Sequence, residues 1–189
     1  MGAGKTTALF MFRDLGAVTM SADAVVHSLY LSSSIRAALV EHFGRGITDE
    51  RGEIDRGRLR EAVRGDSAAR EWLERFIHPR VGAATDRAIR ETPPGKVIVC
   101  EIPLLFESGS RGRFDLVVTI EASPDLRLAR SSHRFDPEGF SEFDSLQAGT
   151  ARRVEGSDMV FYNDGGLERM RAFVREAYTR ALSLVGEAG

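Results

Sequence analysis

The first seven residues have types and a spacing that suit phosphate binding. The chain opens Met1-Gly2-Ala3-Gly4-Lys5-Thr6-Thr7, the second half of the pattern G-x-x-x-x-G-K-[ST]. In that pattern backbone N–H groups and a helix N-terminus surround the phosphates, the lysine reaches the terminal phosphate oxygens, and the hydroxyl binds Mg²⁺. We therefore predict a nucleotide site with Thr6 as the metal ligand. The residues predicted to bind the nucleotide phosphates are Gly2, Ala3, Gly4, Lys5, Thr6 and Thr7.

Half a motif is also compatible with chance or with a flexible glycine-rich end. The residues that follow favour the phosphate site. Thr6 to Leu15 has the composition of a helix, and Gly16 is suited to end it. A helix that begins at the lysine is what phosphate binding requires.

The first glycine of the pattern, and the strand that delivers such a loop, fall upstream of Met1. Without that strand, backbone groups inside the sheet would lack partners, and each would cost about 1–3 kcal/mol against a total stability of about 5–15 kcal/mol. We therefore expect a natural start roughly ten residues upstream, or a truncated sequence.

The elements that must position this loop follow from apolar periodicity. Four short apolar runs predict strands buried on both faces: 17–20, 96–100, 116–120 and 159–162. Helical patterns cover 6–15, 34–43, 56–63, 68–90, 123–130 and 167–185. Polar stretches at 32–34 and 131–141 are predicted loops, and His78-Pro79 is interpreted as architecture that fixes a helix start. The alternation favours an α/β, doubly wound fold with a parallel sheet.

Bulk properties exclude several function classes. The chain has 189 residues, with 26 Lys plus Arg against 28 Asp plus Glu, so it lacks the basic excess expected of a nucleic-acid or anionic-lipid binder. No run reaches the roughly 20 apolar residues of a membrane span. The one cysteine, Cys100, lies in an apolar run and is interpreted as a small buried hydrophobe. We expect a cytoplasmic protein, monomeric or alternatively a homo-oligomer.

Five further segments share an order and spacing with one enzyme family. They are Ser21-Ala22-Asp23 with His27; Phe43-Gly44, Asp49, Gly52, Ile54-Asp55-Arg56 and Leu59; Leu73-Glu74 with His78-Pro79; Glu101-Ile102-Pro103-Leu104-Leu105-Phe106-Glu107; and Gln147, Arg153, Asp158 and Asn163-Asp164-Gly165. Together with the glycine-lysine-threonine cluster, this series resembles the dephospho-CoA kinase family over nearly the whole chain.

The resemblance implies a P-loop kinase fold with three α/β/α layers. It implies one kinase domain over residues 1–189, with a helical acceptor-binding insertion over about 24–92 and a lid over about 131–153. The implied reaction transfers the γ-phosphate of ATP, with Mg²⁺, to the ribose 3′-hydroxyl of dephospho-CoA.

The resemblance also assigns roles to individual residues. Asp23 matches the family position of a general base, whereas the residue pattern alone favours a helix N-cap. Lys5, Arg130 and Arg134 are expected to neutralise charge on the migrating phosphoryl group, although a helical arginine is often only a solvated charge. Glu101 is expected either to reach Mg²⁺ through water or to accept an N–H of the adjacent turn.

Two further residues are expected in the nucleotide site. Arg153 occupies the family's basic position beside the lid. Asn163 follows the last strand, where the family contacts adenine, and the alternative for 163–165 is an ordinary Asn-Asp-Gly turn.

The sequence departs from the family pattern at several positions. Ser21 replaces an aspartate, the lid is about two residues short, and Phe143 stands where an arginine is usual. An aromatic lid with Phe135, Phe140 and Phe143 would close by apolar contact. These departures leave open a kinase for another nucleotide or small metabolite, or an inactive nucleotide-binding copy.

Overall fold

The computed structural model describes residues 2–132, 137–145 and 147–187. The chain divides into two compact units. The first combines Met1–Thr19 with Thr92–Gly189, and the second is Met20–Glu91. The helical region predicted over about 24–92 overlaps the second unit.

The first unit contains both pairs of strands. Its elements are α1 (Lys5–Asp14), β1 (Val18–Ser21, which runs into the second unit), β2 (Ile98–Glu101), η2 (Ser110–Arg113), β3 (Val118–Glu121), α6 (Pro124–Ser131), α7 (Pro137–Ser145), α8 (Thr150–Glu155), β4 (Met159–Tyr162) and α9 (Leu167–Glu187). Each strand lies within two residues of its predicted position. The mixed α/β class is confirmed.

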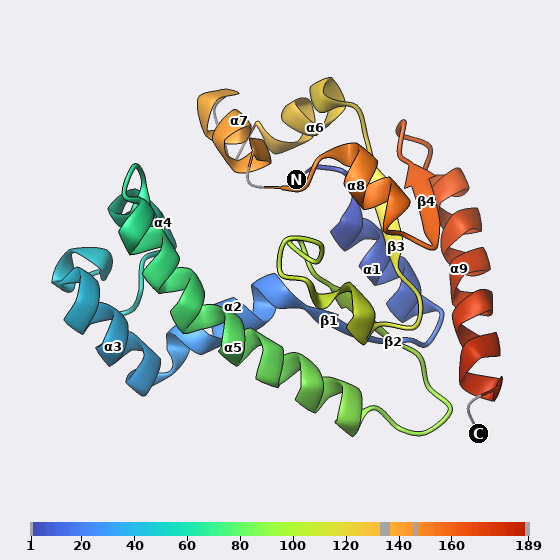
Figure 1. The fold of residues 1–189 in the computed structure, drawn as a ribbon, viewed down its shortest axis with the longest axis horizontal. Coiled ribbons are helices and arrows are strands. Elements are labelled where there is room, and N and C mark those ends of the chain that lie inside the picture. Colours follow the sequence, from blue (N-terminus) through green and yellow to red (C-terminus); the bar gives the residue numbers. More distant parts are fainter. Residues whose placement is uncertain (1, 133–136, 146, 188–189) are drawn as a thin grey trace. The chain divides into compact units, whose positions relative to one another are not determined.

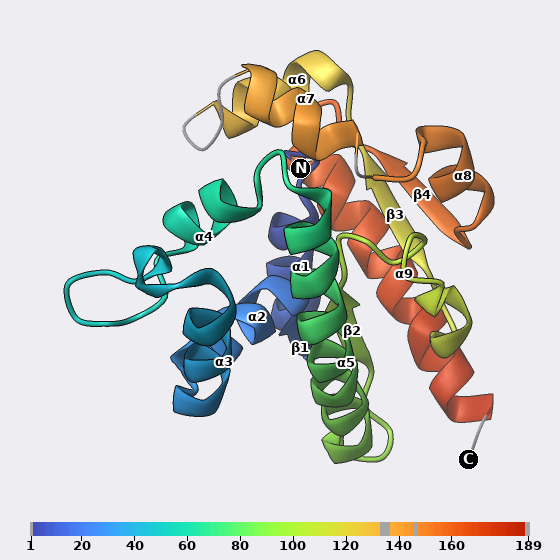
Figure 2. The ribbon, with the colours of Figure 1, turned by 60° about the vertical axis from the view of Figure 1, so that its left-hand side comes forward.

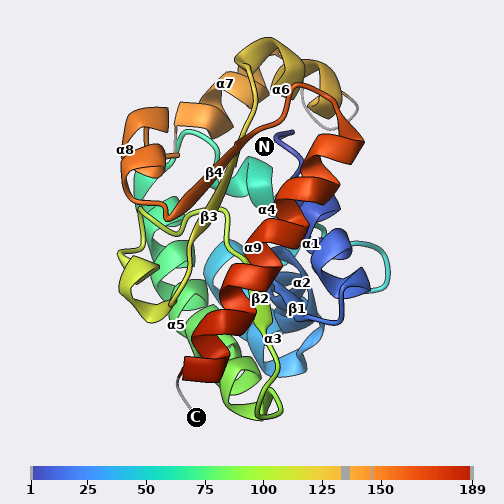
Figure 3. The same ribbon diagram turned by 90° about the vertical axis from the view of Figure 1, so that its right-hand side faces the viewer.

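The strands form two two-stranded sheets, β1–β2 and β3–β4, where the sequence analysis expected one parallel sheet. β3 and β4 are parallel, with Val118 opposite Met159 and Glu121 opposite Tyr162. Helix α9 packs against α1 and β4 (Figure 3). The buried side chains of this unit's core are Ala3, Ala8, Phe12, Ala17, Ile120, Phe161, Met170, Val174 and Ala177.

The second unit is helical, as Figures 1 and 2 show, with α2 packed against α3 and α5. Its elements are α2 (Ala22–Leu31), α3 (Ser33–Phe43), η1 (Arg45–Ile47), α4 (Arg56–Val63) and α5 (Ser67–Glu91). Its core is built around Leu39 and Ile47, both at most 2% exposed. Asp55 caps α4 by accepting the N–H groups of Gly57 and Arg58 at 2.8 and 3.0 Å. The Arg58 N–H bond is the main reason that the pKa of Asp55 is lowered.

Three local expectations were wrong. The stretch 131–141, predicted as a loop, contains the end of α6 and the first residues of α7. Pro137 is the first residue of α7, a position that favours proline, so this helix start was visible in the sequence. Only Ser32 separates α2 from α3, so 32–34 is largely helical. Pro79 lies inside α5, where the sequence analysis expected a helix start. Ile77 and Thr85, on either side of the proline, are buried, and their packing stabilises the helix across this position.

No helix among the described residues is long and apolar enough to cross a membrane.

Cys100 lies half-buried in β2, and burial raises its pKa from 9.0 to about 11. At pH 8 the thiolate fraction should therefore be about 100-fold lower in the folded chain than in the unfolded chain. Alkylation requires the thiolate, so its rate follows this fraction. We expect iodoacetamide to modify native protein at least that much more slowly than urea-unfolded protein. Mass spectrometry follows the reaction, and Cys100→Ser is the blank. Equal rates in the two states would show that the thiol is accessible and unperturbed.

Candidate functional site

The predicted phosphate loop leads directly into α1. Gly2 and Gly4 have φ of +69° and +102°, in the left-handed region that favours glycine. Helix α1 begins at Lys5, as predicted, and Ala8 donates its N–H to the carbonyl of Gly4 at 3.0 Å. A Cβ on Gly2 would lie 2.4 Å from the carbonyl oxygen of Arg127. The loop is therefore a turn that only glycines permit, followed by a helix N-terminus.

Asn163 fixes this turn from the end of β4. Its Nδ2 donates to the carbonyl of Ala3 at 2.7 Å, and the residue is 8% exposed. A Cβ on Gly4 would lie 2.5 Å from the same Nδ2. The Oδ1 of Asn163 accepts the N–H of Gly165 at 3.2 Å, so the Asn-Asp-Gly turn is present as well. Loss of this buried amide would leave polar groups unpaired, at a cost of about 1–3 kcal/mol.

Thr6 and Glu101 form an oxygen-rich pair beside the loop. The Thr6 Oγ1 donates to the two carboxylate oxygens of Glu101 at 3.0 and 3.3 Å, at the end of β2. A hydroxyl and a carboxylate are oxygen donors of the kind that Mg²⁺ prefers. Within the described ranges no three His, Cys, Asp or Glu side chains gather as a metal site. The Thr6 hydroxyl and the Glu101 carboxylate therefore fit the oxygen preference of Mg²⁺ and would be the residues that hold such an ion.

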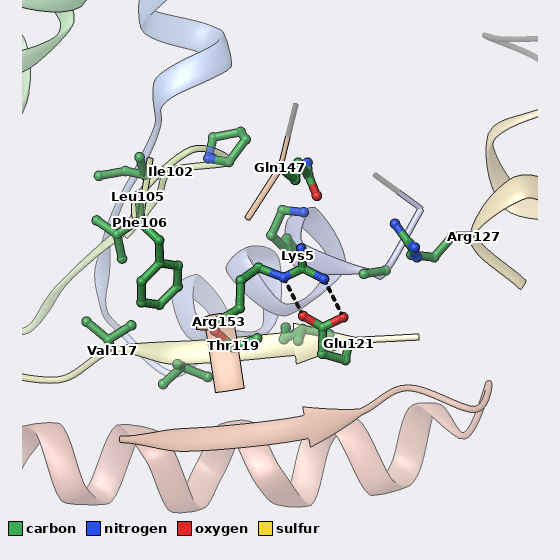
Figure 4. Close-up of a pocket in the computed structure, with 14 residues that line it drawn as sticks. Lys5, Ile102, Leu105, Phe106, Val117, Thr119, Glu121, Arg127, Gln147 and Arg153 are labelled. Carbon is green, nitrogen blue, oxygen red and sulfur yellow. Dashed lines mark hydrogen bonds and ion pairs between the residues drawn. The ribbon is translucent and has the colours of Figure 1, made fainter. Parts of the chain in front are cut away.

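A cavity of about 60 Å³ lies next to the loop (Figure 4). The residues that line it are Ala3, Lys5, Ile102, Pro103, Leu105, Phe106, Val117, Val118, Thr119, Ile120, Glu121, Arg127, Gln147 and Arg153. The cavity thus brings Lys5 together with Arg153, two of the predicted site residues. One wall is apolar and comes from the segment around Phe106, and the other is charged.

The charged wall is a buried ion pair that sequence reasoning did not predict. The Arg153 Nε and Nη2 donate to the two carboxylate oxygens of Glu121 at 2.7 and 2.9 Å. The side chains are 15% and 6% exposed. The hydrogen bonds that Arg153 donates to Glu121 raise the pKa of Arg153. Removing one partner of such a pair costs about 3–5 kcal/mol, because the other charge stays buried without compensation.

A second ion pair joins α6 to α7. Arg127 donates Nη1 and Nη2 to the carboxylate of Asp144, with Nη2 at 3.0 Å from Oδ2. The Arg127 side chain is 7% exposed, and its Nε has no partner among the described residues. This hydrogen bonding lowers the pKa of Asp144. The guanidinium also lies 5.5 Å from the ring of Phe140, a buried residue and one of the phenylalanines expected in the lid.

The remaining predicted residues lie in different places. Arg130 donates to the backbone carbonyl of Asn163 at 3.4 Å, and the side chain of that same residue holds the phosphate loop. Arg134 and Phe135 lie outside the described residues, as does the side chain of Phe143. Thr7 is exposed in the first turn of α1.

Asp23 is exposed in the first turn of α2, in the second unit. The N-cap of this helix is Ser21, so the alternative interpretation of Asp23 as the cap was wrong.

Two curated relatives match almost all of the sequence. The dephospho-CoA kinase of Bordetella parapertussis is 32% identical over 194 residues, which cover 100% of this chain and 90% of the relative. The dephospho-CoA kinase of Mesorhizobium japonicum is 37% identical over 182 residues, covering 92% of this chain and 89% of the relative.

Solved structures give the same fold. TT1252 from Thermus thermophilus has a TM-score of 0.79 at 24% identity, covering 95% of this chain and 93% of its own. The dephospho-CoA kinase from Campylobacter jejuni has a TM-score of 0.65 at 22% identity, covering 94% and 91%. The profile of the dephospho-CoA kinase family matches residues 1–169. The chain therefore belongs to the dephospho-CoA kinase family of ATP-dependent phosphotransferases.

Proposed function

We propose that this chain phosphorylates the ribose 3′-hydroxyl of dephospho-CoA with the γ-phosphate of ATP, in the biosynthesis of coenzyme A. The observation that carries the proposal is the glycine turn that enters α1 at Lys5, in a member of this kinase family. Phosphoryl transfer requires positioning and charge neutralisation more than covalent chemistry from the protein. The loop supplies both, through its N–H groups and the Lys5 ammonium.

The nucleotide's phosphates would lie on the amides of the loop from Gly2 to Thr7, at the positive end of α1. Thr6 and Glu101 would hold Mg²⁺, which when bound neutralises charge on the phosphates. Arg130 and Asn163 meet at the end of β4, and this supports an adenine site along 163–165. Arg130 and Arg134 would supply further positive charge to the migrating group.

Asp23 is the residue proposed to activate the acceptor hydroxyl. An exposed carboxylate at the start of a helix that follows a strand is accessible to a sugar hydroxyl. Asp23 would take the proton of the 3′-hydroxyl as that oxygen attacks the γ-phosphate. Dephospho-CoA would bind along the helices of the second unit. We further propose a monomeric, cytoplasmic enzyme without a nucleic-acid partner.

The acceptor can be identified by an ADP-release assay with ATP and Mg²⁺. We expect dephospho-CoA to stimulate ADP formation, because the chain belongs to the dephospho-CoA kinase family. Adenosine and the nucleoside monophosphates should leave ADP formation at background. Mass spectrometry of the product should show one added phosphate on dephospho-CoA. Stimulation by another acceptor alone would identify a different kinase of the same fold. No ADP formation with any acceptor would identify a non-catalytic copy.

Substitution Asp23→Asn should lower kcat by about 10²–10⁴-fold, because the amide cannot take the proton of the attacking hydroxyl. The KM for ATP should change by less than about 2-fold, since the substitution leaves the phosphate loop intact. Steady-state kinetics measure both constants. Glu41→Gln, another exposed carboxylate of the second unit, is the matched control and should behave as wild type. An unchanged kcat in Asp23→Asn would remove this residue from the mechanism.

Substitution Asn163→Asp keeps the shape of the side chain but replaces the donor to Ala3 by an acceptor. Two oxygens would then face each other, and we expect the free energy of unfolding to fall by about 1–3 kcal/mol. The loop would be displaced, and the KM for ATP should rise about 10-fold or more. Urea unfolding and kinetics test the two effects. Glu176→Gln, an exposed carboxylate on α9 outside the turn, should leave both unchanged. A wild-type KM in Asn163→Asp would show that the loop does not depend on this bond.

A further inference from the structure

The Arg153 guanidinium is almost fully used by the protein itself. Its Nε donates once to Glu121, its Nη2 donates to Glu121 and to Thr150 Oγ1 at 3.0 Å, and its Nη1 donates to the carbonyl of Ala148. Four of the five N–H groups of the guanidinium are therefore engaged. Counting partners among the described residues, one N–H remains, and a single N–H cannot form the two parallel bonds that make arginine a strong phosphate ligand.

The bonds of Arg153 also fold the segment 147–153 onto the wall of the cavity. Arg153 contacts Ala148 and Thr150, which lie one and three residues after Gln147 in the chain, and Gln147 lines the cavity with Lys5 (Figure 4). The same segment is tied a second time, because Glu107 accepts the N–H of Ala148. Residues 147–153 therefore form a short strap that begins at Gln147. The two carboxylates that hold this strap, Glu121 and Glu107, both belong to the first unit.

The other partner of the ion pair reaches the phosphate loop. Glu121 is the last residue of β3, and its carbonyl accepts the N–H of Asn163 at 2.7 Å. Asn163 in turn donates its side-chain amide to Ala3. The Glu121–Arg153 pair thus joins the support of the loop to the strap that carries Gln147.

We propose that Arg153 is a positioning residue: paired with Glu121, it holds Gln147 in place in the Lys5 cavity and does not itself bind ATP. The inference rests on the proposed function and replaces the nucleotide-binding role expected for Arg153. If Arg153 turned to a phosphate, Glu121 would remain as a buried carboxylate without its cation, and this opposes such a movement. A lysine cannot replace this arginine, because it has no planar fork to hold three acceptors.

The test is a double-mutant cycle with Glu121→Gln, Arg153→Lys and the double variant. Kinetics give kcat with dephospho-CoA, and calorimetry gives the Kd of a non-hydrolysable ATP analogue. We expect each single variant to lower kcat by about 10-fold or more, with the Kd changed by less than about 3-fold. The double variant should be no worse than the worse single variant, because both remove the same pair. Glu155→Gln, exposed on the same helix, should be unchanged.

A direct phosphate ligand gives the opposite pattern. Arg153→Lys would then keep most of kcat, or raise the Kd about 10-fold while Glu121→Gln left it unchanged, and either result overturns the proposal. If the pair variants fail to fold, Thr150→Val removes one acceptor of Arg153 and keeps the ion pair; it should lower kcat with the Kd intact, and a wild-type kcat overturns the inference.

The analogue Kd does not depend on the acceptor. If wild type phosphorylates a different acceptor, the proposed function fails, whereas the cycle is measured on that acceptor with the same expected and overturning results.

Discussion

The phosphate loop depends on one buried hydrogen bond between the amide of Asn163 and the carbonyl of Ala3. The loop has left-handed glycines at Gly2 and Gly4, and such a turn has little side-chain packing of its own to hold it. Asn163 supplies the constraint from the end of a parallel strand, where its own backbone is fixed by the carbonyl of Glu121. The conformation that can receive phosphates is therefore set by β3 and β4, far away in the sequence. The helix N-terminus at Lys5 then follows without a side-chain cap, which leaves its N–H groups to a ligand.

Much of the fold could be predicted because it follows from local rules. The four strands are β-branched apolar runs, and α1 begins at Lys5 because the glycine turn precedes a helix-forming stretch. The segment 131–141 was misread because its serines were taken as loop residues. Ser131 is in fact buried in α6, where its hydroxyl donates to the carbonyl of Arg127 at 2.6 Å. A serine that bonds back to its own helix looks the same in sequence as one in a loop.

The site was predictable in its residue types but less so in its pairings. The glycines, Lys5, Thr6 and Asn163 carry a spacing that a pattern can recognise. The partners of Arg153 and Arg127 are carboxylates 32 and 17 residues away, and nothing in the local sequence marks them. The sequence analysis made no prediction for Arg127, and it assigned Arg153 to the nucleotide site because Arg153 occupies the family's basic position beside the lid. Whether such an arginine meets a substrate anion or a carboxylate side chain depends on tertiary packing.

The same pairings explain how a chain with a formal charge of −2 can build an anion site. Several arginines of the first unit are paired with carboxylates within it, among them Arg111 with Asp158, Arg127 with Asp144, and Arg153 with Glu121. The Arg127 and Arg153 guanidinium groups are largely buried, and pairing each with a carboxylate avoids the large cost of an isolated buried charge. It also cancels most of their long-range field, so these arginines contribute structure instead of attraction. The positive potential for a nucleotide must then come from oriented backbone amides, the α1 N-terminus, the Lys5 ammonium and the proposed contributions of Arg130 and Arg134. Those sources are local, which is why the overall charge balance gives no sign of the site.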